Sequence, residues 1–338
     1  MQTETFRFIQ GAIISFSILS FPSSVLAADS VVVYSARKEH LIKPAFDQFT
    51  KETGVAVTYI TDGEAPLMAK LKAEGPRSPA DVFMTVDAGN LWHAAHEGLL
   101  QPVESKVLQD NVPAHLRDPK NQWFGLSVRA RTIAYNPKKV KPAELVGYED
   151  LAGAQWKGRL CLRTSKKVYN QSLVAMMMAD LGAEKTEAIV KSWVGNLATK
   201  VFPDDTAVLK AIDSGACDVG IVNTYYFGAL QKENPSVNVS LFWPDQKGKG
   251  VHVNISGAGV AKHAKNHAGA IKLLEWLSSP SAQKLFADVN LEYPVNPKVE
   301  PAAQVKAWGT FKQNPLNVVR AGEMQAVAIK LMDRAGYQ

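Results

Sequence analysis

The sequence predicts a two-lobed α/β protein whose chain crosses between its lobes more than once. Strand and helix patterns alternate along most of the 338 residues, and two long extended runs, at residues 124–135 and 251–256, bracket one of the α/β series. A chain of roughly 310 residues after the N-terminal segment exceeds the size at which a single core usually stops growing. We therefore expect two lobes joined by hinge crossings, each a mainly parallel sheet flanked by helices.

The first lobe opens with a strand–helix–strand–helix–strand pattern. Residues 31–34 form a short apolar strand, and residues 41–53 follow as an amphipathic helix that ends at Gly54. The later elements of this series alternate between strand and helix, at residues 55–60, 65–75, 81–85 and 91–98. Such a series implies a parallel sheet with right-handed crossovers. Its ligand-facing edge should lie beyond the carboxyl ends of the strands.

A second α/β series occupies the middle of the chain, and helices dominate its end. Strands are expected at Leu160 and Val219. Helices are expected at residues 172–181, 207–214, 268–277 and 281–289, with a last one ending near Met332. The extended runs divide the chain into an N-terminal lobe, residues 29–127 and 256–303, and a C-terminal lobe, residues 128–255. The helices of residues 304–338 are expected to pack on the C-terminal lobe.

The first 28 residues predict a secretory signal peptide. The apolar stretch at residues 11–21 is too short to span a bilayer of about 30 Å. Residues 25–27, Val-Leu-Ala, fit a small-x-small cleavage pattern, so cleavage is expected after Ala27 or Ala28. The prediction is that the chain is exported.

Charge and motif content exclude several classes of function. The formal net charge is +6, and the lysines and arginines are dispersed rather than massed. The sequence holds no helix-turn-helix, zinc-finger or aromatic-basic motif, so we expect no nucleic-acid partner. It also holds no Ser-His-Asp or Cys-His set with supporting local sequence, and we therefore expect a protein that is not an enzyme.

The chain has two cysteines, Cys161 and Cys217. In an exported protein, two thiols are more often a disulfide than a metal pair. Both cysteines lie in short apolar segments that read as parallel strands of one sheet, so we predict a bond between them. It would close a loop of about 55 residues, for which the chain-entropy model gives roughly 4 kcal/mol of stabilisation.

Two adjacent tyrosines, Tyr225 and Tyr226, follow an apolar stretch and could converge both hydroxyls on one point. Deprotonated phenols are hard, anionic oxygen donors, the ligand type that a small and highly charged cation such as Fe³⁺ prefers. An arbitrary pair of this kind is more often one core residue and one surface residue. The interpretation as a metal site therefore depends on the rest of the sequence.

Several segments support a metal site by their order and spacing, which fit a known pattern across nearly all of the chain after residue 28. They are VYSARKE (33–39), PADVFMTVD (79–87), LSVRAR (126–131), CLRTS (161–165), VYNQSL (168–173) and NTYY (223–226). With these segments the chain resembles bacterial periplasmic ferric-ion-binding proteins, the substrate-capturing subunits of iron(III) ABC importers. The resemblance implies a transferrin-like, class II periplasmic-binding-protein fold that closes as a clamshell on iron. It also implies a periplasmic monomer whose partner is an inner-membrane ABC permease.

The resemblance implies a site built on tyrosines. Tyr225 and Tyr226 match two phenolate ligands of the family, and Tyr169 matches a third that one subgroup uses. Three phenolates would neutralise Fe³⁺, whereas a lone buried phenolate would be costly. Some relatives place a His, or a His-Tyr pair, where this chain has Lys38 and Glu39. Glu39 remains a candidate ligand, beside its ordinary role as a carboxylate at a helix start.

Three tyrosines leave coordination positions open on an octahedral ion. A small oxyanion is the simplest filler, and carbonate or bicarbonate could chelate through two oxygens. Arg37, after the first strand, and Arg129, in the first extended run, are the residues expected to bind it. A guanidinium offers a planar fork to a planar oxyanion. The alternative for each arginine is an ordinary ion pair.

Two other functions stay open on the sequence. One is clamshell binding of a non-metal solute such as thiamine, a polyamine or a phosphonate. The other is a periplasmic metallohydrolase that would use His93 and His96, which share a helix face but lack the HExxH spacing. Among the remaining polar residues, Asp204 is expected to cap a helix, and Asn254 and Ser256 to line the second crossing between the lobes.

Overall fold

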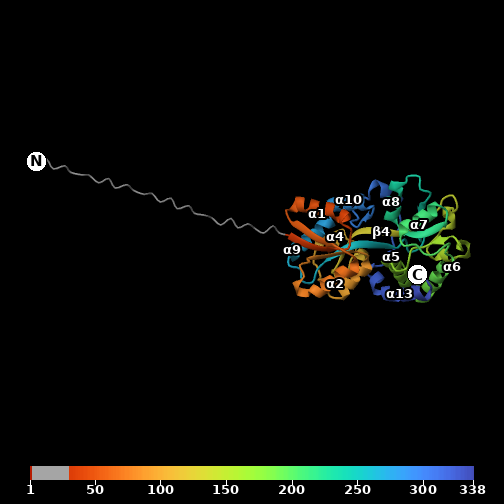
Figure 1. Ribbon diagram of the computed structural model, residues 1–338, viewed down its shortest axis with the longest axis horizontal. Helices are drawn as coiled ribbons and strands as arrows, with labels where there is room; N and C mark the ends of the chain where they lie inside the picture. The colour runs from red at the N-terminus through yellow and green to blue at the C-terminus, as the bar shows by residue number, and fades with distance from the viewer. Residues whose placement is uncertain (2–29) are drawn as a thin grey trace.

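The computed structural model describes residue 1 and residues 30–338. Apart from residue 1, the predicted signal peptide lies outside the described residues. The remainder forms two lobes arranged along the longest axis of the molecule (Figure 1).

One mixed sheet runs through both lobes of the described chain. Its strand order is β2-β1-β3-β8-β4-β6-β5, and β7 and β9 also pair with β4. The strands are β1 (Ser30–Ser35), β2 (Ala56–Thr61), β3 (Val82–Val86), β4 (Phe124–Tyr135), β5 (Leu160–Cys161), β6 (Val219–Asn223), β7 (Ser240–Phe242), β8 (Val253–Val260) and β9 (Tyr293–Pro294). The predicted parallel pairs are present at β1–β2, β1–β3 and β5–β6, whereas the pairs that β4 and β8 make are antiparallel.

The helices lie on both sides of the sheet, as α1 and α2 show in the N-terminal lobe (Figure 1). In chain order they are α1 (Glu39–Thr53), α2 (Glu64–Glu74), α3 (Ala88–His96), α4 (Lys106–Asn111), α5 (Val168–Leu181), α6 (Ala183–Gly195), α7 (Asp205–Asp213), α8 (Thr224–Glu233), α9 (His267–Leu277), α10 (Pro280–Asn290), α11 (Ala303–Lys306), α12 (Val319–Glu323) and α13 (Gln325–Arg334).

Strand β4 is the first crossing between the lobes, where the sequence predicts one. All 12 of its residues are buried. Its first half, from Phe124 to Ala130, pairs with β8, and its second half, from Arg131 to Tyr135, pairs with β6. A single strand is therefore shared by both lobes, and its Arg129 lines the cleft between them.

The amphipathic pattern of the first helix is confirmed in α1. Ile42, Ala45, Phe46 and Phe49 are buried, and they repeat at the spacing of one helix face. The helix ends at Gly54, whose φ of 73° is a left-handed conformation that glycine adopts without a steric penalty.

Several elements differ from the sequence expectation. Helices α4, α6, α8, α11 and α12 and strands β7 and β9 have no predicted counterpart. Helix α5 begins at Val168 rather than near residue 172. Strand β8 continues through Gly257 and Gly259 instead of ending before them. The strand needs glycine here because neighbouring β4 approaches it closely. A Cβ at Gly257 would lie 2.4 Å from the carbonyl oxygen of Phe124.

Buried apolar side chains form one core in the N-terminal lobe and two in the C-terminal lobe. Along β4 the membership changes between Ala130 and Ile133. Near the end of the chain, Val319 belongs to the N-terminal core, whereas Ala328 and the residues after it belong to a C-terminal core. The lobe boundaries stay a proposal, and these contacts lead us to place the last return to the C-terminal lobe near α13 rather than at residue 304.

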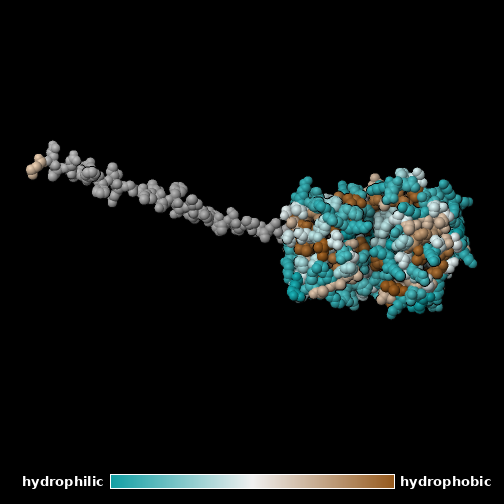
Figure 2. Space-filling view, viewed as in Figure 1, coloured by the Kyte–Doolittle hydropathy of each residue, from teal (hydrophilic) through white to brown (hydrophobic). Residues whose placement is uncertain are grey.

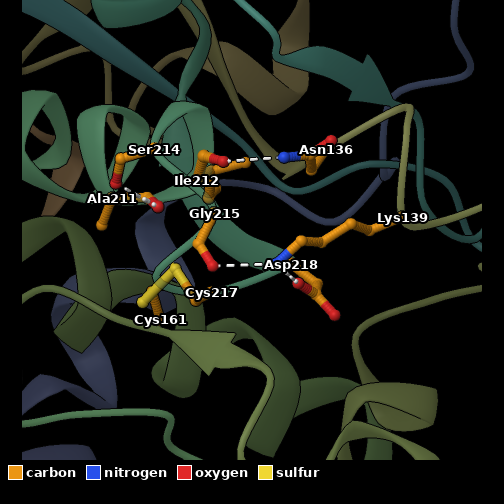
Figure 3. Close-up of a disulfide and its surroundings, with 9 residues drawn as sticks. All are labelled: Asn136, Lys139, Cys161, Ala211, Ile212, Ser214, Gly215, Cys217 and Asp218. Atoms are coloured by element: carbon orange, nitrogen blue, oxygen red, sulfur yellow. Dashed lines mark hydrogen bonds and ion pairs between the residues drawn. A yellow bond between two sulfur atoms is a disulfide. The ribbon is translucent and has the colours of Figure 1, made fainter.

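The predicted disulfide between Cys161 and Cys217 is present. Cys161 ends β5 and Cys217 lies two residues before β6, its parallel neighbour. The Cα atoms are 5.9 Å apart, and 56 positions separate the two residues in sequence. Figure 3 shows the bond beside the turn after α7, where the Lys139 ammonium donates to the Gly215 carbonyl oxygen. The bond therefore joins β5 to the segment that leads into β6, within one C-terminal core.

Hydrophilic side chains predominate along the outline of both lobes, and hydrophobic ones gather in smaller patches on the face shown (Figure 2). Among the described residues, no helix has the length and apolar character needed to cross a bilayer.

Candidate metal centre in the cleft

A cavity of about 690 Å³ lies between the two lobes. The C-terminal lobe contributes Tyr169, Tyr225 and Tyr226 to its wall, and the N-terminal lobe contributes Arg37 and Glu292. The cavity therefore brings together the three predicted tyrosines and both predicted anion-binding arginines, Arg37 and Arg129.

The tyrosines occupy the first turns of two helices. Tyr169 is the second residue of α5, and Tyr225 and Tyr226 are the second and third of α8. Helix α8 begins directly after β6, so the carboxyl end of that strand fixes where the tyrosine pair lies. The partial positive charge at a helix N-terminus favours anions, and all three phenols lie where phenolates would be stabilised.

The three phenols are close enough to act on one ligand. The rings of Tyr225 and Tyr226 have centroids 4.3 Å apart. The phenols of Tyr169 and Tyr226 lie close enough to Tyr225 to affect its charge, and Tyr226 lies close to the guanidinium of Arg163. Burial raises the pKa of Tyr225 well above its ordinary value, and its tyrosine neighbours raise it further. Without a bound cation the Tyr225 phenol therefore keeps its proton at neutral pH.

Three cations surround the ring of Tyr169. The guanidinium carbons of Arg129 and Arg163 lie 4.9 and 5.5 Å from the ring centroid, and the Lys167 ammonium lies 5.1 Å from it. Contacts of this length are attractive cation–π contacts. They give the cleft a positive field beside the phenols, which suits a ligand that carries negative charge.

A buried ion network holds the C-terminal wall in place. The Asp205 carboxylate, which is fully buried, accepts from the guanidinium of Arg131 at 3.1 Å and from that of Arg163 at 3.3 Å. It also accepts from the backbone N–H of Asn223, the residue that precedes α8, at 2.9 Å. Asp205 therefore links the strand that carries Arg131 to the start of the tyrosine helix. The neighbouring Asp204 caps α7, as predicted.

The two predicted anion-binding arginines differ in their partners. Arg37 donates to the carboxylate of Glu292 at 3.1 Å, and its guanidinium lies 3.5 Å from the hydroxyl of Ser127. Arg129 donates to the hydroxyl of Ser256 at 3.2 Å, while its Nε and Nη2 atoms are buried without a hydrogen-bond partner among the described residues. Arg129 therefore has N–H groups to offer a ligand, and Arg37 forms an internal ion pair.

Asp87 connects the lobes behind the cleft. It caps α3, and it accepts from Ser172 on α5 at 2.6 Å and from Asn254 on β8 at 2.9 Å. The Arg129 guanidinium lies 3.8 Å from the same carboxylate. Burial raises the pKa of Asp87 above its ordinary value, against the opposing effect of Arg129. The predicted positions of Asn254 and Ser256 beside the crossing agree with these contacts.

Two other sequence candidates lie away from the tyrosines. Glu39 begins α1 on the surface and accepts from the hydroxyl of Tyr59, and it is not part of the cavity wall. His93 bonds to Gln325, and His96 stacks on Trp92. Over residues 30–338, no three His, Cys, Asp or Glu side chains are grouped so that they could hold a metal. The histidine pair therefore gives no support to a zinc hydrolase.

Sequence reasoning missed Asn290 and Glu292, which also line the cleft. Glu292 lies 255 positions from Arg37, its partner. No local motif indicates such a contact. The one usable signal was a carboxylate next to an apolar strand, and that pattern is too common to single out a residue.

Several known proteins with similar sequences and folds are named for iron uptake or iron binding. Residues 44–313 match the family of bacterial extracellular solute-binding proteins. Iron uptake protein A1 of Synechocystis sp. is 43% identical over 312 residues, covering 90% of this chain and 87% of that protein. The structure of Trichodesmium IdiA (FutA) in complex with iron and citrate ligands is 46% identical, with a TM-score of 0.89, and covers 91% of this chain and 100% of that one. Ferric iron-binding protein A of Mannheimia haemolytica, solved in an open conformation, is 40% identical, with a TM-score of 0.87 and coverage of 92% and 99%.

Proposed function

The chain belongs to the family of bacterial extracellular solute-binding proteins, and we propose that it binds ferric iron in the cleft between its lobes. The observation that carries the proposal is the convergence of Tyr169, Tyr225 and Tyr226 at the starts of two helices in one cavity. Similar proteins bear names that state iron uptake or ferric iron binding. The protein is a transport component rather than an enzyme.

The chemistry of the site suits a trivalent cation. Three phenolates supply three negative charges and hard oxygen donors, which match Fe³⁺ in charge and in ligand type. The tyrosines have to lose their protons when the metal binds, so binding releases protons and weakens in acid. The cations that surround Tyr169 would then stabilise a negatively charged ligand in the rest of the coordination shell.

A small oxyanion of the carbonate type would fill the positions that three tyrosines leave open. Arg129 supports this role because two of its N–H positions lack a partner among the described residues. Arg37 lies in the same cavity wall but is engaged by Glu292. The anion site is therefore proposed mainly on Arg129, with Arg37 as a second donor.

The two-lobed fold suggests a capture cycle. All three tyrosines belong to one lobe, so iron can bind that lobe while the cleft is open. The other lobe then closes when its charged groups meet the bound anion, because only contacts that differ between two states shift their equilibrium. The related protein from Mannheimia haemolytica was solved in an open conformation. We propose that the closed, loaded form delivers iron in the periplasm to an inner-membrane ABC permease.

A visible absorption titration of the apo-protein with ferric ion, with and without bicarbonate, tests the function. We expect a broad phenolate-to-iron charge-transfer band that develops to one equivalent and requires bicarbonate. A band of equal strength without bicarbonate would keep the iron site and reject the anion. Absence of a band under both conditions would reject iron binding. It would favour a clamshell binder of a non-metal solute, to be sought by thermal shift.

A further inference from the structure

Residues 290–292 enter the cleft through an unusual backbone conformation. Asn290 ends α10, and Glu292 precedes β9. Leu291 between them has a φ of 52°, in the left-handed region that a bulky side chain adopts only at a cost. All three residues line the cavity that holds the tyrosines. A strained residue that places two polar side chains in one cavity indicates that their position matters for binding.

Asn290 has a buried amide side chain with unused hydrogen-bonding capacity. Its side chain is 8% exposed, and neither Oδ1 nor Nδ2 has a hydrogen-bond partner among the described residues. An unsatisfied buried polar atom typically costs about 1–3 kcal/mol, and such groups in native proteins call for an explanation. A ligand in the cleft that both accepts and donates a hydrogen bond would satisfy the amide.

Glu292 determines which arginine is available. Its carboxylate is buried and accepts from Arg37 and from the hydroxyl of Ser127. Arg129, which is 2% exposed, has no hydrogen-bond partner for Nε and Nη2 among the described residues, and Nη2 lies 3.8 Å from the Asp87 carboxylate. An anion that enters the cleft therefore meets two groups with unused hydrogen-bonding capacity, Arg129 and Asn290, and one arginine that already holds the Glu292 carboxylate.

We propose that Asn290 and Glu292 select the anion that accompanies the metal. Arg129 and the Asn290 amide bind a small oxyanion such as bicarbonate, whose oxygens accept and whose hydroxyl donates. A larger polycarboxylate such as citrate has to displace Glu292 from Arg37 in order to bind its second carboxylate. This inference rests on the proposed iron function and adds to it the residues that discriminate between anions.

The test compares two anions on four proteins. Acidified ferric chloride is added in substoichiometric steps to apo-protein in bicarbonate-free buffer, and the charge-transfer band is followed against added bicarbonate or citrate. The proteins are the wild type, Glu292→Gln, Asn290→Leu, and the matched control Glu300→Gln, whose carboxylate pairs with Lys306 on the surface.

Glu292→Gln removes the carboxylate that pairs with Arg37. We therefore expect the half-saturating citrate concentration to fall about tenfold or more, since a hydrogen bond to a charged group contributes about that factor. The half-saturating bicarbonate concentration should change less than about threefold, because Arg129 and Asn290 are unaltered.

Asn290→Leu should raise the half-saturating bicarbonate concentration about tenfold. It should also raise the Tm of the apo-protein, because an unsatisfied amide is replaced by an apolar group of similar size. A residue with only a structural role would not move these two quantities in the same direction. Glu300→Gln should change the half-saturating concentration of neither anion.

Removing Glu292 leaves Arg37 buried without this partner, so the double variant Arg37→Gln with Glu292→Gln guards against misfolding. This double variant should return the half-saturating citrate concentration to the wild-type value, because the Arg37 guanidinium is no longer present to bind the second carboxylate. If Glu292→Gln changes the half-saturating concentrations of both anions equally, Glu292 does not select between them. If that variant loses the band with bicarbonate, Glu292 is a metal ligand instead. An Asn290→Leu protein with an unaltered half-saturating bicarbonate concentration would show that Asn290 does not bind the anion. No band in the wild type with either anion would instead reject the iron function itself.

Discussion

The two lobes contribute different chemistry to the same cleft. The C-terminal lobe supplies three phenols from the first turns of α5 and α8. The N-terminal lobe supplies a guanidinium, a carboxylate and an amide, from the loop after β1 and from residues 290–292. The phenols stand in the first turns of helices braced by buried ion pairs, whereas the opposing groups stand in the loop after β1, at the end of α10 and in the segment after it. The proposed metal ligands thus reside on one lobe, and the charged and polar groups that could meet an anion reside on the other.

The largest expected effect comes from the ligand-bearing lobe. Replacing both Tyr225 and Tyr226 with Phe should lower ferric affinity by at least about a thousandfold, since even residues that only support a metal ligand contribute 10–100-fold. Glu39→Gln in the other lobe should leave affinity and the charge-transfer band unchanged, because Glu39 faces Tyr59 outside the cavity. Competition against a chelator measures both. Preserved affinity in the double variant, or a loss in the Glu39 variant, would reverse the assignment of the lobes.

The disulfide offers a second contrast, because both cysteines belong to the C-terminal lobe. Cys161→Ser with Cys217→Ser should lower the free energy of unfolding by about 4 kcal/mol, the chain-entropy value for a loop of this size. Hydrogen exchange followed by mass spectrometry should become faster in β5 and β6 and stay unchanged in β1 and β3. Uniformly faster exchange in both lobes would show that the lobes unfold as one unit.

His252 lies just before β8, on the second crossing, and should make stability depend on pH. Burial, together with the nearby Arg131 and Arg129, lowers the pKa of its imidazole to about 3. Between pH 3 and 6.5 the unfolded chain binds a proton that the folded chain excludes, so stability falls as the pH falls through this window. His252→Leu should remove about 2 kcal/mol of this loss at pH 5.

Urea unfolding at pH 8 and pH 5 measures that difference. His263→Leu is the matched control, because His263 is exposed. Identical pH responses of the two variants would show that the crossing tolerates a charged imidazole and is looser than its burial suggests.

The smallest effect belongs to the ion pair that spans the cleft mouth. Lys167 of the C-terminal lobe lies 3.5 Å from Glu64 of the N-terminal lobe, and both side chains are partly exposed. A double-mutant cycle with Ala at both positions should give a coupling free energy for closure of at most about 1 kcal/mol, and a smaller one at high salt. Small-angle scattering of the iron-loaded forms measures how far each variant closes. A larger coupling would make the rim, rather than the bound anion, the main force for closure.

Sequence reasoning reached further in one lobe than in the other. The disulfide and the crossing at β4 follow local patterns, namely two thiols in apolar strands and a long extended run. The tyrosine site and Arg37 follow from the resemblance to a known family. Glu292 follows no pattern, since it lies 255 positions from Arg37, its partner. The pairing of Asp205 with Arg131 and Arg163 across the sheet was invisible because it depends on tertiary packing. Contacts set by strand order need the fold to be known first.

The composition of the third core has a consequence for synthesis. Its buried members all lie between Ala134 and Val239, and the disulfide is among them. Strand β8 and helices α9 and α10, which the N-terminal lobe requires, come later in the chain. As the polypeptide emerges, the segment that bears Tyr225 and Tyr226 can be cross-linked and packed before the opposing wall exists. Contacts between residues near in sequence also form faster than distant ones. The part of the C-terminal lobe that holds Tyr225 and Tyr226 can therefore form first, whereas the second core of that lobe waits for Ala328 and the residues after it, the last to be synthesised.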